Sequence, residues 1–349
     1  MKILHIIFQM LTGGAETMLA DIVNEQIYNG NEVEILIVNR GENDVVMKTI
    51  SPSVKVSRFN RTPGAAPLLL MARLNLFVLR RRPDVVHLHM HKLTGLLKVM
   101  KGRTLFTVHA LDIPMIYAAD SNMAAISEAV AANVKARVPN AKIRVVSNGI
   151  DTSAIKVRGD RKPAERVRIV QVSRLIAEIK GQDILIQAIA QLVSSGYDVE
   201  CTFIGEGTDL EMLKELAGRE GVSDRVNFTG NLPRKEIYSR LAEFDLMCHP
   251  SRFEGFGLTV AEGMAAGLPL VVPEGGGPWE VADSGRLAET FVNDDPTTCA
   301  KAIAHVIDHY PACLRRAAEA REYVEANFSV KRMVKQYADI YRDMVDGKF

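Results

Sequence analysis

The chain of 349 residues is long enough for two domains with full cores, and 47% hydrophobic with 24% charged residues exclude a disordered or fibrous protein. Its net charge of +1 hides an asymmetry: residues 1–160 contain 20 Lys and Arg against 13 Asp and Glu, whereas residues 161–349 contain 23 against 29. The basic first part is compatible with an anionic membrane surface, an acidic acceptor or nucleic acid, with ordinary scatter of charge as the alternative.

The four cysteines have neither close pairing nor metal-ligand spacing, and Cys201 and Cys248 fall in apolar, strand-like runs. We therefore expect buried free thiols in a reducing compartment. The apolar run at residues 3–8 is too short for a signal peptide, and no stretch has the roughly 18 apolar residues that a membrane span needs. These features predict a cytoplasmic protein.

Short β-branched runs alternate with helix-length amphipathic runs, which is typical of βαβ units and parallel sheets. In the first part we expect strands at residues 3–8, 33–38, 84–89, 104–109, 124–126 and 143–146. We expect helices there at residues 15–26, 66–81, 93–100 and 128–137.

A polar stretch with a proline, residues 148–163, is the best candidate for a linker. Beyond it we expect strands at residues 167–172, 199–204, 226–228, 245–248 and 270–272, and helices at 181–194, 209–219, 234–243, 258–266, 296–309, 312–326 and 330–345. The pattern predicts an α/β protein with two doubly wound, Rossmann-like domains, residues 1–160 and 161–328, facing each other across a cleft at the carboxyl ends of their sheets. Residues 329–349 would form a carboxyl-terminal helix that crosses back to the first domain.

Two adjacent glycines, Gly13 and Gly14, stand between the first strand and the first helix. Glycine lets the backbone come close to a phosphate or sugar at a helix start, and a tight turn without a ligand is the alternative. The spacing is not the G-x-G-x-x-G fingerprint, and no acidic residue ends the second strand in the expected place. A dinucleotide-dependent oxidoreductase is therefore disfavoured.

Two cations, Arg174 and Lys180, flank a short loop after the first strand of the second domain. Ligands bind at the carboxyl ends of strands in such sheets, and an Arg fork with a Lys point charge suits a pyrophosphate. Solvated surface cations are the alternative.

The most informative pair of residues is Glu254 and Glu262. Glu254 falls on a glycine-bearing loop after a strand, and Glu262 falls about 6 Å along the axis of the helix that starts near Leu258. Between them are the first amides of that helix, which attract anions. Two carboxylates on either side of a phosphate site predict a nucleotide-sugar as the ligand.

These segments together resemble the retaining glycosyltransferases of family 4, which have the GT-B fold. The resemblance rests on residues 174–180, 205–207 and 267–269 and on the pair Glu254 and Glu262. It extends to the Gly13-Gly14 loop and to residues 146–151, so it covers nearly the whole chain.

The resemblance implies a role for each matching residue. Glu254 would bind hydroxyls of the donor sugar, and Glu262 would bind the hydroxyls of the ribose. Arg174 and Lys180 would hold the diphosphate and stabilise the charge that develops as it leaves. The other donor contacts implied are the backbone amides of Phe256, Gly257 and Leu258, the Gly13-Gly14 loop of the other domain, and Asn231 and Leu232 at the base.

His109 ends a strand of the first domain and matches a histidine that lies beside the donor sugar in this family. The resemblance thus assigns it a catalytic role, with a satisfied strand-end histidine as the alternative. The chain departs from the family pattern at residues 277–280, where Trp279 stands before Glu280 in place of a proline.

His87, His89 and His91 alternate, so they would share one face if the strand continued that far. Three histidines on one face are a metal-binding pattern. However, no carboxylate or cysteine accompanies them, and family-4 enzymes are generally metal-independent. We expect no metal and no other cofactor.

The run at residues 67–82 is an apolar helix that ends in Arg80, Arg81 and Arg82. A crossover helix with favourable charge at its carboxyl end explains this pattern. Peripheral docking to anionic lipid on the inner face of the membrane is the functional alternative.

The sequence as a whole predicts a retaining glycosyltransferase that moves a sugar from a nucleoside-diphosphate-sugar to a hydroxyl of a glycan or lipid-linked acceptor. Its place would be in cell-surface polysaccharide biosynthesis, with no nucleic acid as a partner. The rivals are a nucleotide-sugar epimerase or phosphorylase on the same scaffold and a non-catalytic sugar-nucleotide-binding protein.

Overall fold

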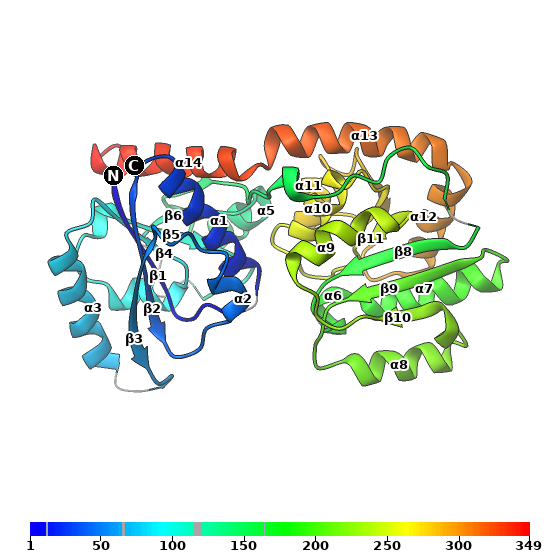
Figure 1. Cartoon of the computed structure of the whole chain (residues 1–349), viewed down its shortest axis with the longest axis horizontal. Helices are drawn as coiled ribbons and strands as arrows, with labels where there is room; N and C mark the ends of the chain where they lie inside the picture. Colours follow the sequence, from blue (N-terminus) through cyan, green and yellow to red (C-terminus); the bar gives the residue numbers. More distant parts are fainter. Residues whose placement is uncertain (12, 65–66, 115–120, 164) are drawn as a thin grey trace. The chain divides into compact units, whose positions relative to one another are not determined.

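The computed structural model describes residues 1–349 except 12, 65–66, 115–120 and 164, and the chain divides into two compact units (Figure 1). Unit 1 comprises residues 1–149 and 330–349, and unit 2 comprises residues 150–329. The division falls after Gly149, whereas the sequence pattern placed it after residue 160.

Arg158 explains why the polar segment after Gly149 belongs to unit 2. Its buried guanidinium donates to the carbonyl of Phe244 (2.8 Å) and pairs with the buried carboxylate of Asp245 (2.9 Å). Breaking such a buried pair costs about 3–5 kcal/mol. A segment that reads as a solvated linker is therefore fastened to the second sheet.

The sheet of unit 1 has seven parallel strands in the order β3-β2-β1-β4-β5-β6-β7. Because β1 lies between β2 and β4, the connections change direction at the β1/β4 boundary, which is where ligands bind in open α/β sheets. The strands are β1 (Lys2–Ile7), β2 (Glu32–Asn39), β3 (Lys55–Arg61), β4 (Val85–Leu88), β5 (Thr104–Val108), β6 (Asn122–Ala125) and β7 (Ile143–Val145).

The helices of unit 1 pack on both faces of this sheet, with α1 and α3 on opposite sides (Figure 1). The carboxyl-terminal helix α14 contacts α1 and contributes Tyr337, Ile340 and Tyr341 to the core that contains Ile3. The helices are α1 (Gly14–Tyr28), α2 (Asp44–Met47), α3 (Pro67–Arg81), α4 (His91–Leu96), α5 (Glu128–Arg137) and α14 (Val330–Val345).

The sheet of unit 2 has six parallel strands in the order β10-β9-β8-β11-β12-β13, so its switch point lies between β8 and β11. Apolar strand residues pack against α7 and α12 in one continuous core. The strands are β8 (Val167–Val172), β9 (Val199–Ile204), β10 (Val226–Phe228), β11 (Leu246–Cys248), β12 (Leu270–Pro273) and β13 (Glu289–Phe291).

The helices of unit 2 follow the predicted positions closely where the apolar periodicity is long. Cys201, Cys248, Cys299 and Cys313 are all buried free thiols, as expected for the first two from their apolar surroundings. The helices are α6 (Ala177–Lys180), α7 (Gln182–Ser194), α8 (Leu210–Arg219), α9 (Arg234–Arg240), α10 (Leu258–Ala265), α11 (Gly276–Val281), α12 (Pro296–Asp308) and α13 (Tyr310–Asn327).

Two strands that the sequence pattern missed, β3 and β13, are the edges of their sheets. An edge strand has one neighbour and tolerates charged residues, so it lacks the apolar run that reveals a central strand. In β3, for example, Arg58 pairs with Glu42 (2.6 Å) at the surface.

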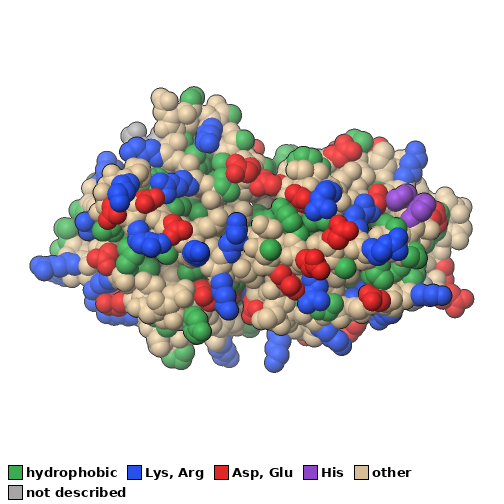
Figure 2. Space-filling model, turned by 90° about the horizontal axis from the view of Figure 1, so that it is seen from above, with side chains coloured by type: hydrophobic (Ala, Val, Ile, Leu, Met, Phe, Trp, Pro, Cys, Tyr) green, Lys and Arg blue, Asp and Glu red, His purple; other side chains and the backbone are tan. Residues whose placement is uncertain are grey.

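In the view of Figure 2, Lys and Arg side chains are interspersed with Asp and Glu side chains. Among the described residues, no helix combines the length and the apolar character that crossing a membrane requires.

Candidate active site

The residues predicted to bind the donor in unit 2 lie where parallel strands end. Because carboxyl ends of parallel strands meet at one edge of the sheet, loops far apart in the sequence are brought together there. Arg174 follows β8, residues 205–207 follow β9, Asn231 and Leu232 follow β10, and Glu254 follows β11.

Lys180 and Glu254 form an ion pair across the switch point between β8 and β11. Their side chains are 16% and 22% exposed, so both remain within reach of a ligand. Gly181 permits the approach: its φ is +66°, and a Cβ there would lie 2.0 Å from the carbonyl oxygen of Pro250. The short helix α6 thus ends against the loop that carries Glu254.

Glu254 is held as a carboxylate. Burial by itself would raise the pKa of Glu254, but His249 and the positive charge of Lys180 outweigh it and hold the pKa at about 2. His249 Nε2 lies 3.7 Å from Glu254 Oε2 and 3.0 Å from the Ser251 hydroxyl. Glu254 is therefore an acceptor of hydrogen bonds near neutral pH and not a proton donor.

His249 was not predicted from the sequence. It follows β11 directly and is 2% exposed, and the Thr259 hydroxyl lies 3.2 Å from its Nδ1. A signal was available, because His249 directly follows the strand predicted at residues 245–248, much as His109 ends the strand predicted at residues 104–109.

The side chain of Arg174 is exposed, whereas hydrogen bonds hold the backbone around it. The backbone carbonyl of Arg174 accepts a hydrogen bond from Gln182 Nε2 (2.8 Å). The backbone N–H of the next residue, Leu175, donates to the backbone carbonyl of Glu206 (3.0 Å). A Cβ on Gly205 would lie 2.0 Å from the carbonyl of Ser173. The glycines after β9 therefore let the two loops pack together and fix the place from which Arg174 reaches out.

The first turn of α10 lies beside Glu254. Gly257 is the N-cap of this helix, and the amides of a first turn have no acceptors within their own helix. Of the two residues that flank Gly257, Phe256 is buried and Leu258 is partly buried. Such a helix start favours an anion.

Glu262 lies one turn into α10, where it accepts a hydrogen bond from the Tyr238 hydroxyl (3.0 Å). Tyr238 accepts in turn from Arg234 Nε (2.7 Å), and burial, followed by Glu262, raises the pKa of Tyr238. Tyr238 and Arg234 were not predicted, although their spacing of four residues on α9 places them on one helix face. They fix the orientation of the Glu262 carboxylate.

Asn231 and Leu232 lie between β10 and α9, with Asn231 exposed and Leu232 partly buried. A bridge between Gly205 and Gly230 joins this loop to the one after β9. The predicted base contacts are therefore on the same edge of the sheet as Lys180.

Residues 277–280, which depart from the family pattern, lie in the short helix α11. Gly277 donates its amide to the carbonyl of Glu254 (3.2 Å), and a Cβ on Gly277 would lie 2.5 Å from the amide nitrogen of Phe256. Trp279 does not prevent this helix from packing against the Glu254 loop.

In unit 1, the Gly13-Gly14 loop joins β1 to α1, and His109 follows β5. Gly13 has φ −173°, an extended conformation that any residue adopts, so its backbone does not require glycine. The nearest described atom to a Cβ there would be Oε2 at the end of the Glu16 side chain (2.5 Å). His109 is half-buried, and burial lowers its pKa to about 4.

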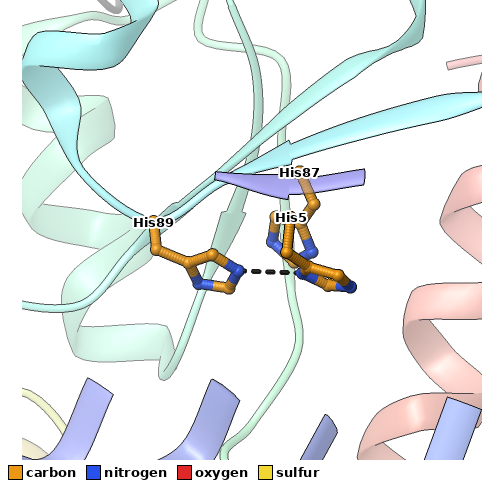
Figure 3. Close-up of side chains that lie close together, drawn as sticks. All are labelled: His5, His87 and His89. Carbon is orange, nitrogen blue, oxygen red and sulfur yellow. Dashed lines mark hydrogen bonds between the residues drawn. The ribbon is translucent and has the colours of Figure 1, made fainter. Parts of the chain in front are cut away.

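The strand does not continue far enough for His87, His89 and His91 to share one face. β4 ends at Leu88, and His91 begins α4. The third member of the buried cluster is His5 of β1, which pairs in register with His87 (Figure 3). The sequence pattern missed His5 because the pairing of β1 with β4 is not visible locally.

Comparison with known proteins identifies the family to which the chain belongs. Residues 12–154 match the family described as Glycosyltransferase Family 4, and residues 154–323 match Glycosyl transferases group 1. The chain is 27% identical over 285 residues to glycogen synthase of Mycobacterium tuberculosis, covering 74% of this chain and 69% of the relative. It is also 27% identical over 225 residues to the lipopolysaccharide core biosynthesis mannosyltransferase LpsB of Rhizobium meliloti, covering 60% and 62%.

Solved structures show the same fold. HepE of Anabaena in complex with UDP-glucose superposes with a TM-score of 0.81 at 21% identity, covering 98% of this chain and 99% of that one. A glycosyltransferase of Rickettsia africae superposes with a TM-score of 0.82 at 17% identity, covering 98% of each chain. The chain therefore belongs to glycosyltransferase family 4 and is a glycosyltransferase with the GT-B fold.

Proposed function

We propose that the protein is a retaining glycosyltransferase that takes a sugar from a nucleoside-diphosphate-sugar and transfers it to a hydroxyl of a glycan or lipid-linked acceptor. The observation that carries this proposal is the Lys180–Glu254 pair at the β8/β11 switch point, beside the first turn of α10. A cation, a helix start and a carboxylate in one place suit a diphosphate joined to a group rich in hydroxyls.

The charges of the site give each residue a distinct part in the reaction. Glu254, ionised at neutral pH, accepts hydrogen bonds from hydroxyls of the donor sugar. Lys180 and Arg174 neutralise the diphosphate as the bond to the sugar breaks, and the departing phosphate oxygen takes the proton of the attacking hydroxyl. We expect these two side chains and the α10 amides to balance the negative charge of the diphosphate without a metal ion.

Glu262 occupies the other end of the site. It lies about 6 Å along the helix axis from the first residue of α10. Held by Tyr238, its carboxylate can accept from the two hydroxyls of a ribose. The donor would then extend from Glu262 across the helix start to Glu254.

The comparisons support this assignment at the level of the reaction. The named relatives include a glycogen synthase and a lipopolysaccharide core biosynthesis mannosyltransferase. HepE was crystallised with UDP and with UDP-glucose. These names favour a nucleotide-sugar donor and a role in cell-surface polysaccharide biosynthesis.

A thermal-shift screen with UDP-, GDP-, ADP- and dTDP-sugars tests the proposal. We expect one nucleotide series to raise the melting temperature of the parent and of Lys214→Ala, a control at an exposed lysine on α8, but not of Lys180→Ala. Product analysis with the selected donor then separates transfer from the rival activities, since an epimerase needs no acceptor and a phosphorylase consumes phosphate. Stabilisation that survives Lys180→Ala would contradict the assigned site.

We also propose that α3 contacts an anionic membrane, where a lipid-linked acceptor would be found. Leu68, Leu69, Leu76 and Leu79 are exposed along this helix, between 48% and 74%. Arg80 and Arg82 are also exposed, and within the described part of the chain neither pairs with a carboxylate, whereas Arg81 pairs with Glu34 (3.1 Å). Apolar side chains next to unpaired cations are typical of helices that lie in the lipid interface.

Flotation with phosphatidylglycerol-containing liposomes tests this contact. Arg80→Glu/Arg82→Glu should lose binding, while the charge reversal Lys214→Glu/Arg219→Glu on α8 should keep it. Arg81 is left unchanged because its pair with Glu34 belongs to the fold. Equal flotation of the two variants would contradict the proposal.

A further inference from the structure

Unit 1 contains a buried histidine network that the donor site of unit 2 does not explain. His5 of β1 and His87 of β4 are in-register neighbours, and His89 follows β4 (Figure 3). Their rings are 0–1% exposed, with the His87 and His89 centroids 4.4 Å apart. His109, after β5, extends the network to a half-buried position.

All four rings are neutral near pH 7. Burial lowers the pKa of His5 and of His109 to about 4. Burial, followed by the neighbouring histidines, lowers the pKa of His87 and of His89 as well. A neutral imidazole has one nitrogen that donates and one that accepts, so each ring in a hydrogen-bonded series determines the next.

Gln26 of α1 is the member of this network with a fixed polarity, since its amide has a carbonyl that only accepts and an NH2 group that only donates. His5 Nε2 lies 2.8 Å from Gln26 Oε1 and therefore carries a proton. His5 Nδ1 must then accept, and its partner at 3.0 Å is His89 Nε2, which must donate (Figure 3).

The same reasoning continues to the end of the series. With its proton on Nε2, His89 accepts at Nδ1 from His109 Nε2 (3.3 Å). His109 then has its proton on Nε2, facing the interior. Its Nδ1 is left as a hydrogen-bond acceptor, and no protein partner for this atom occurs among the residues that the structure describes.

The side-chain NH2 group of Gln26 begins a second arm of the network, which is a series of hydrogen bonds that runs through Tyr341 to His87. Gln26 Nε2 donates to the Tyr341 hydroxyl of α14 (3.4 Å), which in turn donates to His87 Nδ1 (2.6 Å). His87 Nε2 then donates to the Thr107 hydroxyl (2.6 Å). Both nitrogens of His87 are thus used in short hydrogen bonds. Both ring nitrogens of His5 and of His89 also have protein partners, which favours a relay over a metal site at these three buried rings.

We propose that Gln26 is a positioning residue that holds His109, through His5 and His89, in the Nε2–H tautomer, so that His109 presents an accepting Nδ1 to a ligand hydroxyl. Turning the Gln26 amide around would reverse every hydrogen bond of the series together, and His109 would then present an N–H. The orientation of one buried amide therefore decides whether His109 accepts from a hydroxyl or donates to an oxygen.

Nitrogen-15 NMR of the full chain, labelled at histidine, reads the tautomers directly, because protonated and unprotonated ring nitrogens have well-separated resonances. We expect a protonated Nε2 and an unprotonated Nδ1 for His5, His89 and His109 at pH 7. A protonated Nδ1 in His109, or an imidazolium in any of the three, would overturn the proposal. This spectrum of the parent protein needs no variant.

Three variants then test whether Gln26 determines the tautomer of His109. Gln26→Leu should leave His109 in a mixture of tautomers, and Gln26→Glu, which can still accept from His5, should restore the parental one. Tyr341→Phe cuts the second arm and should alter His87 while His109 keeps its tautomer. A parental His109 spectrum in Gln26→Leu would reject the role of Gln26.

The contact of His109 with a sugar hydroxyl rests on the proposed function, and kinetics test it separately. Gln26→Leu should raise the KM for the sugar donor about threefold to tenfold, the loss expected for one neutral hydrogen bond, and Gln26→Glu should restore it. An unchanged KM together with the expected tautomers would support the relay and remove His109 from the sugar site.

Discussion

Units 1 and 2 have the same arrangement of central strands but carry different chemistry at their switch points. In unit 2 the position between β8 and β11 is occupied by Lys180 and Glu254, which are charged and partly exposed. In unit 1 the position between β1 and β4 is occupied by His5 and His87, which are buried and neutral. The topology brings polar groups together in both units. Burial keeps His5 and His87 neutral, whereas His249 and Lys180 outweigh burial and keep Glu254 charged.

The comparison also separates two ways of binding a ligand. A carboxylate and an ammonium group that remain near water act on a ligand through charge. Histidines removed from water act through the direction of their hydrogen bonds, which depends on where each proton resides. Each prediction below changes one of these two properties.

Acidification should destabilise the histidine network of unit 1. The pKa of folded His5 is about 4, below its ordinary 6.5, so the unfolded chain takes up a proton first as the pH falls. The free energy of unfolding should decline between pH 6.5 and pH 4, by about 3 kcal/mol from His5 alone. Urea unfolding across this range should show a shallower decline for His5→Gln, and an equal decline in both proteins would contradict the neutral network.

Removing either charge from the pair in unit 2 should slow the reaction. Glu254→Ala or Lys180→Ala should reduce turnover 100-fold or more, about 2.7 kcal/mol of transition-state stabilisation. Steady-state kinetics with the donor selected by the thermal-shift screen measure this loss, and Glu211→Ala on α8 serves as the carboxylate control. Near-parental turnover in both variants would refute the assigned roles.

Comparing Gly181→Ala with Gly196→Ala should separate two costs of adding a Cβ, which are the collision with a neighbouring carbonyl and the strain of a positive φ. Both Gly181 and Gly196 have positive φ, but only Gly181 has a neighbouring carbonyl in the way, at 2.0 Å from the added Cβ. Gly196→Ala should lower the free energy of unfolding by about 1 kcal/mol. Gly181→Ala should lower it by about 2 kcal/mol or more and weaken donor binding, because Lys180 is displaced. Equal losses in stability would show that the loop after β11 adapts.

Tyr238→Phe should have the smallest effect. It removes the hydroxyl that donates to Glu262 but leaves the carboxylate in place. We expect donor binding, measured by calorimetry, to weaken by about 1 kcal/mol, with turnover at saturating donor unchanged. A loss in turnover without a loss in binding would mean that Glu262 acts on the reacting sugar and not on the ribose.

The meeting of Lys180 and Glu254 in unit 2 was easier to infer from the sequence than the histidine cluster of unit 1. Arg174, Lys180 and Glu254 each follow a strong apolar strand, and strand ends in parallel sheets share one edge. Their meeting could therefore be inferred before the strand order was known. The partners His249 and Tyr238 were missed, although a strand end and a helix spacing pointed to them.

The site of unit 1 could not be inferred in this way. The alternation of His87, His89 and His91 placed them on one face only if the strand continued, but the strand ends at Leu88 and His5 completes the cluster. The contribution of Tyr341 requires that a helix at the end of the chain packs against α1. The sequence led us to expect that this helix crosses back to the first domain, but neither the pairing of His5 with His87 nor the bond from Tyr341 to His87 has a local signal.

Sequence alone determined the alternation of strands and helices, the loops that carry the charged donor residues, and the family resemblance. Periodicity and strand-end position are local properties, and local patterns of apolar residues encode them. Only the tertiary structure decided which histidines meet, which residues fasten the segment after Gly149 to unit 2, and which amide orients the network. Register, burial and proton position are settled by packing between distant segments, and a linear pattern does not contain them.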